Sequence, residues 1–299
     1  MKKIALKISF FLLLVAAADY CIGWILARAY TTAKSGNIAK ANYAINACKE
    51  DIVFIGASDV THHIISKNIA DSLQMSCFNL GIDGLNSYFQ LGVLQSILKR
   101  YTPKIIVIST NILADSDVKT KADIKSLLPY CNNHPAIKAL VTKTDSSEQF
   151  KLWSKCYPYN SLLLDILQGN IKSEPNTFGY KALYGTNAAL QLNTNPPALN
   201  FTKQSLENFK VMLAAAKQQK CAVYIFQAPR YQSVAHAQDQ ALLLSLANEY
   251  KVGFLNYVTD TAFINHRNYF KDAAHLNNSG ATLLTQKIIT VLKHTTVNH

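Results

Sequence analysis

A serine and a distant aspartate–histidine pair have the residue types that acyl-transfer chemistry requires. Ser58 follows a short apolar run at 51–55 and two small residues. This pattern predicts a strand that ends in a tight turn and presents the serine hydroxyl at the carboxyl edge of a sheet. Asp272 precedes His275 by three residues, a spacing at which a carboxylate can orient an imidazole. Together the three residues predict a nucleophile, its orienting carboxylate and a base.

The sequence also allows purely structural roles for the same residues. Ser58 is also placed to cap the helix expected after its strand. Asp272 can cap the last helix, which would leave His275 on a helix face. His62 and His63 lie closer to Ser58 in the chain, but a helix starting after Ser58 would carry them away from the hydroxyl. We therefore expect these two histidines at the rim or on the surface.

The elements that must position these residues alternate along the chain. Apolar, β-rich runs predict strands, and stretches with helical periodicity lie between them. The expected strands are 51–55, 76–80, 104–109, 221–227 and 252–256, and the expected helices are 66–74, 87–100, 203–219, 238–250 and 278–293. Nearly continuous apolar strands between helices are typical of a parallel sheet covered on both faces. The sequence thus predicts an α/β fold, a flavodoxin-like doubly wound parallel sheet, within one domain at 51–299.

A long insertion interrupts this alternation at about 112–201. It has short helical stretches at 119–128, 146–153 and 161–167, separated by loops that contain Gly, Pro, Asn and Tyr. Because it has no strand signal, we expect a mostly helical cap beside the site that helps to select the substrate.

The N-terminal 28 residues form a separate segment in the sequence. Three lysines precede an apolar run that begins at Ile8, passes Asp19 and ends near Ala27. Its length is about the 20 residues that cross a bilayer, which predicts a transmembrane anchor at 1–28. Small residues before Asp19 also fit cleavage of a signal segment there. Both interpretations place the domain outside the cytoplasm, membrane-anchored in the first case, with 29–50 as a connector.

Charge and cysteine content restrict the function classes. The net charge is +12, but the lysines are scattered and form no block with interleaved aromatic residues, so nucleic acid is not an expected partner. A basic surface near an anionic membrane or envelope polymer fits better.

The six cysteines have no CxxC or CxxH spacing, which argues against a zinc site. The sequence leaves open a disulfide between Cys131 and Cys156. It also leaves open a metal site with oxygen ligands from Asp59, Asp83 and Asp272, although their spacing matches no known ligand pattern.

Four short segments fall at the ends of expected strands one to three and after the last strand. They are Gly-Ala-Ser-Asp at 56–59, Asn-Leu-Gly-Ile-Asp-Gly at 79–84, Ser-Thr-Asn at 109–111 and Asp-Ala-Ala-His-Leu-Asn at 272–277. In this order they resemble the SGNH (GDSL-like) hydrolase family, and most closely its membrane-anchored, envelope-facing bacterial members. Two departures stand out: alanine occupies the middle of the first block, and the third block lacks the usual glycine before its asparagine and the aspartate after it.

The resemblance implies a role for each matched residue. Ser58 would be the nucleophile, His275 the base and Asp272 its orienting carboxylate. The backbone amides of Ser58 and Gly84 and the side-chain amide of Asn111 would bind the oxyanion.

Two further residues stay open. Gly81 lies in the same turn as Gly84 and can replace it as the amide donor. Arg230 follows the fourth expected strand and either lines the pocket, where it would meet an anionic group, or is solvated at its rim.

These expectations give an extracytoplasmic serine esterase or O-acyltransferase with no cofactor. It would act on an acylated carbohydrate or cell-envelope polymer through an acyl-enzyme on Ser58, so the expected partners are an acyl ester or glycan substrate and, through the N-terminal helix, the membrane. The competing hypothesis is a non-catalytic, membrane-tethered glycan-binding or scaffold protein with the same fold.

Overall fold

The computed structural model describes residues 2–172, 177–196 and 198–297, with backbone alone for the last three. Contacts divide the chain into two compact units. Unit 1 comprises Met1–Asn42 and Ile124–Glu174, and unit 2 comprises Tyr43–Asp123 and Pro175–His299. The N-terminal segment therefore folds with the middle of the expected cap, whereas the rest of the insertion folds with the sheet.

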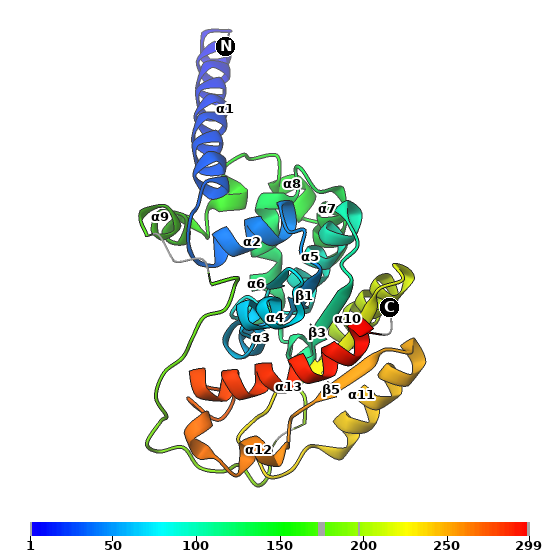
Figure 1. The fold of residues 1–299 in the computed structure, drawn as a ribbon. Helices are drawn as coiled ribbons and strands as arrows, with labels where there is room; N and C mark the ends of the chain where they lie inside the picture. Colours follow the sequence, from blue (N-terminus) through cyan, green and yellow to red (C-terminus); the bar gives the residue numbers. More distant parts are fainter. Residues whose placement is uncertain (1, 173–176, 197, 298–299) are drawn as a thin grey trace. The chain divides into compact units, whose positions relative to one another are not determined.

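Unit 2 contains one five-stranded sheet (Figure 1). Its strands are β1 (Ile52–Ile55), β2 (Cys77–Asn79), β3 (Ile105–Ser109), β4 (Ala222–Gln227) and β5 (Gly253–Asn256). All pairs are parallel, in the order β2-β1-β3-β4-β5. This is the doubly wound order that reverses direction between β1 and β3. The predicted α/β class and all five predicted strands are confirmed, with ends that differ by one residue.

Helices cover the sheet because parallel strands need crossover connections. The helices of unit 2 are α3 (Ser58–His63), α4 (Ser66–Leu73), α5 (Ser87–Arg100), α10 (Lys203–Gln218), α11 (Ala237–Tyr250), α12 (Thr261–Ile264) and α13 (Asn278–Val297). Short 3-10 turns follow β3 at η1 (Thr110–Leu113) and precede the last loop at η4 (Arg267–Tyr269). Helix α13 packs on α3 and α4, and α10 packs on α5 and α11.

The core follows from the apolar strands. One strand face joins a cluster with α13, which includes Phe54, Val107, Phe226, Leu284 and Ile288. The alternate side chains of β1 and β3 are also fully buried, as expected for strands covered on both faces. Because both faces are packed, the sheet offers ligands its carboxyl edge, where β1 and β3 end.

Unit 1 contains α1 (Lys2–Thr31), α2 (Gly36–Asn46), η2 (Leu128–Tyr130), α7 (Pro135–Thr144), α8 (Glu148–Lys151), η3 (Tyr157–Tyr159) and α9 (Leu163–Ile171), while α6 (Asp117–Leu127) and the end of α2 straddle the unit boundary. Helix α1 is long and apolar enough to cross a membrane or to serve as a signal anchor. The expected connector at 29–50 holds the end of α1 and the whole of α2. The three helical stretches expected in the cap overlap α6, α8 and α9, and α7 is a helix that the sequence pattern did not predict.

The cysteines do not form the disulfide that the sequence left open. All six are free thiols in the structure. Cys131 Sγ donates to the Leu127 carbonyl within its own helical turn, and Cys156 Sγ donates to the Asp19 carbonyl. Each thiol thus contacts a backbone carbonyl of its own and is not bonded to the other.

A buried carboxylate fixes the start of α5. Asp123 Oδ1 accepts from the Asn86 amide at 2.8 Å, and Oδ2 accepts from Tyr88 and Phe89 at 3.0 and 3.2 Å. Burial raises the pKa of Asp123 to about 7 despite these donors. The side chain supplies acceptors that the first turn of a helix otherwise lacks.

We predict that Asp123→Ala lowers the free energy of unfolding by roughly 1–3 kcal/mol, because three amides lose their acceptors. Asp123→Asn keeps one acceptor and should have a smaller effect. The measurement is urea unfolding in detergent. Asp117→Ala, at an exposed position of the same helix, is the matched control and should stay within about 0.5 kcal/mol. Equal effects at the two positions would contradict this role.

Candidate active site

Ser58 lies at the carboxyl end of β1 and is the first residue of α3. Residue Ala57, not Ser58, occupies the cap position, where its carbonyl accepts from the Thr61 amide at 3.1 Å. The serine side chain therefore does not cap α3, and that interpretation is wrong. As the first helical residue, Ser58 also has a backbone N–H with no intrahelical partner.

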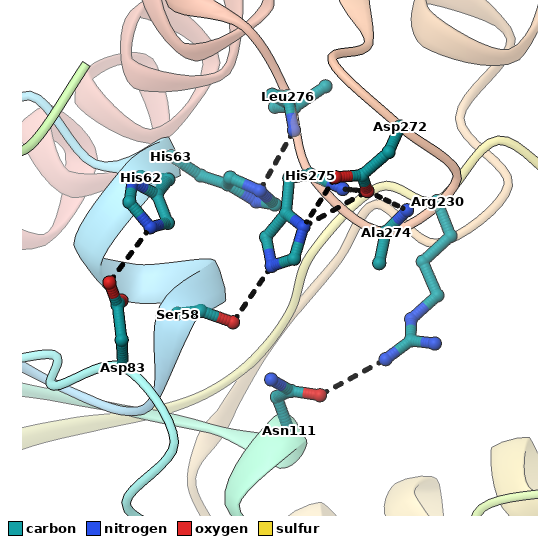
Figure 2. Close-up of polar contacts among 10 residues, drawn as sticks. All are labelled: Ser58, His62, His63, Asp83, Asn111, Arg230, Asp272, Ala274, His275 and Leu276. Carbon is teal, nitrogen blue, oxygen red and sulfur yellow. Dashed lines mark hydrogen bonds and ion pairs between the residues drawn. The ribbon is translucent and has the colours of Figure 1, made fainter. Parts of the chain in front are cut away.

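Ser58, His275 and Asp272 form a continuous hydrogen-bonded chain (Figure 2). Ser58 Oγ lies 2.9 Å from His275 Nε2. His275 Nδ1 lies 3.0 Å from both carboxylate oxygens of Asp272. Since only Nδ1 faces a carboxylate, the ring proton belongs there, which leaves Nε2 free to accept the serine proton.

Asp272 closes a local turn rather than capping α13, which begins at Asn278. Its Oδ1 accepts from the backbone amides of Ala274 and His275, both at 2.9 Å. Partial burial opposes ionisation, but these donors and the imidazole together lower the pKa of Asp272. The carboxylate is therefore charged and fixed where it orients His275.

The loop that carries His275 is fastened to α3 by a second histidine. The Leu276 amide donates to His63 Nε2 at 3.0 Å, and His63 is fully buried. Next to it, His62 contacts the Lys181 carbonyl through Nδ1 at 2.7 Å and Asp83 Oδ2 through Nε2 at 3.2 Å. Both imidazoles meet the His275 ring edge-on.

The expectation that His62 and His63 lie at the rim or surface is therefore wrong. Their exposed fractions are 6% and 0%. Helix α3 begins at Ser58 and α13 packs on it, so the face four and five residues after the serine is covered rather than open to water.

Asn111 lies in η1, after β3, and its side chain is paired with Arg230. Arg230 Nη2 donates to Asn111 Oδ1 at 3.0 Å, which turns Asn111 Nδ2 toward Ser58 in Figure 2. The Asn111 backbone is fixed as well, because its amide donates to Ser109 Oγ at 3.0 Å and Ser109 Oγ donates to Asp59. Asp59 is buried, and this burial raises the pKa of its carboxyl.

The two glycines differ in what they can donate. Gly81 N–H already donates to Asn79 Oδ1 at 3.0 Å, so Gly81 is not the free amide that the sequence left open. A Cβ at Gly81 would lie 2.5 Å from the Thr61 nitrogen, which explains the glycine by close packing. Gly84 has a φ of +76° on an exposed turn. Its expected role as a donor stays a prediction.

A cavity of about 210 Å³ opens at this edge of the sheet. It is lined by Ser58, Asp59, Thr110, Asn111, Leu199, Gln227, Ala228, Arg230, Ala274 and His275. Arg230, which is partly exposed, is thus among the residues that line the pocket. The cavity brings together a serine hydroxyl, an imidazole, a neutral amide and a guanidinium group. Among the residues described, neither Gly81 nor Gly84 lines it.

Within the described ranges, no three His, Cys, Asp or Glu side chains are grouped so as to hold a metal ion. Of the three carboxylates considered from the sequence, Asp272 contacts His275, Asp83 contacts His62 and Asp59 accepts from Ser109. Each therefore has a partner of its own in the network of the site.

Comparisons with known proteins add little. No family model matches the chain, and no curated protein matches it. Among solved structures, the chain is similar to a gut microbial diltiazem-metabolizing enzyme, with a TM-score of 0.41 and 11% identity over 80% of this chain. The match takes in 46% of that enzyme, so the chain spans less than half of its length. So distant a likeness carries no argument about function.

Burial of His63 gives stability a pH dependence. Burial, together with the nearby charges of His275, His62 and Arg230, lowers the pKa of His63 well below its usual value. The unfolded chain then binds a proton near pH ~6.5 that the folded chain does not, so stability falls as pH decreases below that value.

We predict that His63→Gln, which keeps a hydrogen-bond acceptor, reduces the decrease in the free energy of unfolding at low pH. The measurement is the free energy of unfolding in urea at about pH 7.5 and about pH 5.5, where a full proton would contribute about 1.4 kcal/mol per pH unit. A variant with the same difference between the two pH values as the wild type would refute the assignment.

Proposed function

We propose that the protein is a serine hydrolase of the esterase or O-acyltransferase type. The observation that carries this is the hydrogen-bonded chain from Ser58 Oγ through His275 to Asp272, at 2.9 and 3.0 Å. Such a chain activates a hydroxyl that is otherwise a weak nucleophile. Its position on the wall of a cavity gives an ester access to the serine.

In the acylation step, Ser58 Oγ attacks the ester carbonyl carbon while His275 Nε2 takes the hydroxyl proton. Asp272 stabilises the resulting imidazolium and holds the ring in place. When the tetrahedral intermediate collapses, the C–O bond to the leaving alcohol breaks and His275 returns the proton to that oxygen. The products of this step are the free alcohol and an acyl ester on Ser58.

The oxyanion is bound by the Ser58 N–H and by Asn111 Nδ2. The first is supported by the position of Ser58 at the start of α3, and the second by the Arg230 contact that fixes the amide. A neutral amide suits this place because a carboxylate would repel the developing charge. Each such donor is typically worth about 3 kcal/mol in the transition state.

In the second step, His275 deprotonates water or a sugar hydroxyl, whose oxygen attacks the acyl carbon. The C–O bond to Ser58 Oγ then breaks, and His275 returns the proton to that oxygen. Water gives an esterase and a sugar hydroxyl gives an acyltransferase, because both share the acyl-enzyme. We propose an acylated carbohydrate or envelope polymer as the substrate and an extracytoplasmic location. The apolar α1 and the net charge of +12 support both proposals.

We also propose membership of the SGNH hydrolase family. The order of its four blocks, ending with Asp and His three residues apart, supports this placement. The altered third block, around Asn111, is the main departure from the family pattern. The hydrogen bond from Arg230 holds the Asn111 side chain in place of the residues that this block lacks.

We predict that Ser58→Ala abolishes hydrolysis of a small aryl acetate, with a loss of about 10³-fold or more. The measurement is steady-state turnover of the full chain in detergent. The exposed Ser146→Ala is the matched control and should retain wild-type rates. If wild type and Ser58→Ala turn over equally slowly, the non-catalytic scaffold hypothesis is favoured instead.

A double-mutant cycle tests whether Arg230 acts through Asn111. We predict that Asn111→Ala lowers kcat by about 10²-fold, since one oxyanion donor is lost. Arg230→Ala should lower it less, because the amide remains but is no longer held. The double variant should be no slower than Asn111→Ala alone. Multiplicative losses would mean that Arg230 acts independently, for example by binding an anionic group of the substrate.

A further inference from the structure

Unit 1 exposes a set of large apolar side chains outside α1. They are Phe150 and Trp153 around the end of α8 and Leu163, Leu164, Leu167 and Ile171 on α9, with exposed fractions from 49% to 79%. We call this set the apolar face. Single exposed apolar residues are ordinary on a protein surface, but a gathered set indicates a contact with something else.

Helix α9 has two distinct apolar sides. At about 100° per residue, the four exposed side chains of α9 fall within an arc of about 100°. Ile166 and Gly169 are buried on a different side. The side with Ile166 and Gly169 packs within unit 1. The apolar residues of the exposed arc therefore do not belong to the core of that unit.

Both parts of the apolar face are tied to the second half of α1. The Asp19 carboxylate accepts from Ser154 Oγ at 2.6 Å and from the Lys155 and Cys156 amides at 2.7 and 3.2 Å. A Cβ at Gly23 would lie 2.4 Å from Lys155 Cβ, so this glycine lets the 154–156 turn lie directly on the helix.

Helix α9 is attached near the end of α1. The Gly169 carbonyl accepts from the Lys34 amide at 2.8 Å, and Asn170 Nδ2 donates to the Ala29 carbonyl at 2.9 Å. Figure 1 shows α9 beside this end of α1, and contacts between the two helices agree. The exposed arc of α9 thus belongs to a helix that is attached directly to the exposed apolar helix α1.

The length of α1 sets the depth of these contacts. If Lys7 lies at one head-group layer, a hydrocarbon core of about 30 Å extends over about 20 further residues, to near Ala27. Asp19 would then lie about 18 Å from Lys7, inside the hydrocarbon. About 100° around α1 from Asp19 and Gly23, Tyr20 and Trp24 are 63% and 65% exposed. The 154–156 turn that satisfies Asp19 must therefore meet lipid too.

We propose that the apolar face of unit 1 is seated in the interfacial layer of the bilayer that α1 crosses. The 154–156 turn would lie below the head groups beside Asp19, and Trp153 would reach from it toward the head-group layer, where tryptophan is enriched. Helix α9 would lie along the surface with its exposed arc toward the acyl chains. The exposed Lys155 and Lys172 flank the face and can reach lipid phosphates. The proposal needs α1 to be a membrane helix but does not depend on the acyl chemistry of Ser58.

The two tryptophans of the chain, Trp24 and Trp153, allow a matched test. Trp24→Phe leaves Trp153 as the sole reporter, and Trp153→Phe leaves Trp24 on α1. Each full-length variant is placed in nanodiscs of phosphatidylcholine and phosphatidylglycerol without other protein. Quenching is measured with lipid that carries a spin label near the top of the acyl chain and with iodide in the water, against N-acetyltryptophanamide as the aqueous standard.

The expected result is at least about twofold stronger quenching of Trp153 by the labelled lipid than by iodide, with Trp24 also quenched by lipid. Leu164→Asp with Leu167→Asp, in the Trp24→Phe background, should shift Trp153 toward iodide quenching. If Trp24 is quenched by lipid but Trp153 behaves like the aqueous standard, the proposal is overturned, and a protein partner would be the remaining occupant. Failure of the chain to enter nanodiscs would overturn it as well.

Discussion

The hydrogen bond between Ser58 Oγ and His275 Nε2 joins residues 217 positions apart, and most of the site exists to keep it formed. On one side, β1 ends directly before α3 and places the serine at the sheet edge. On the other, the loop that bears His275 is held by Asp272 from within and by His63 from α3. Helix α3 thus carries the serine and also, through His63, holds the loop that positions the His275 imidazole.

Much of this arrangement could be predicted from the sequence. The strands are short apolar runs bounded by polar or small residues, so periodicity located all five of them within one residue. Because carboxyl ends of parallel strands share one edge, Ser58 and Asn111 were expected together. The Asp272–His275 spacing carried enough local geometry to predict that the carboxylate would orient the imidazole.

The rest depends on packing that no local pattern encodes. His62 and His63 looked peripheral because the chain does not reveal that α13 covers α3; their spacing of four and five residues from Ser58 was the available signal. The Arg230–Asn111 contact joins segments 119 residues apart. Similarly, the cost of Asp19 in an apolar helix is offset by donors from 154–156, which sequence periodicity cannot locate.

Covalent labelling tests the central claim most directly. The full chain would be incubated with a fluorophosphonate, digested and mapped by peptide mass spectrometry, with Asp272→Asn as a variant whose histidine is no longer correctly oriented. The account predicts one stoichiometric adduct on Ser58 and labelling at least about 10²-fold slower in Asp272→Asn. An unlabelled wild type, an adduct on another residue, or equal rates in the two proteins would contradict it.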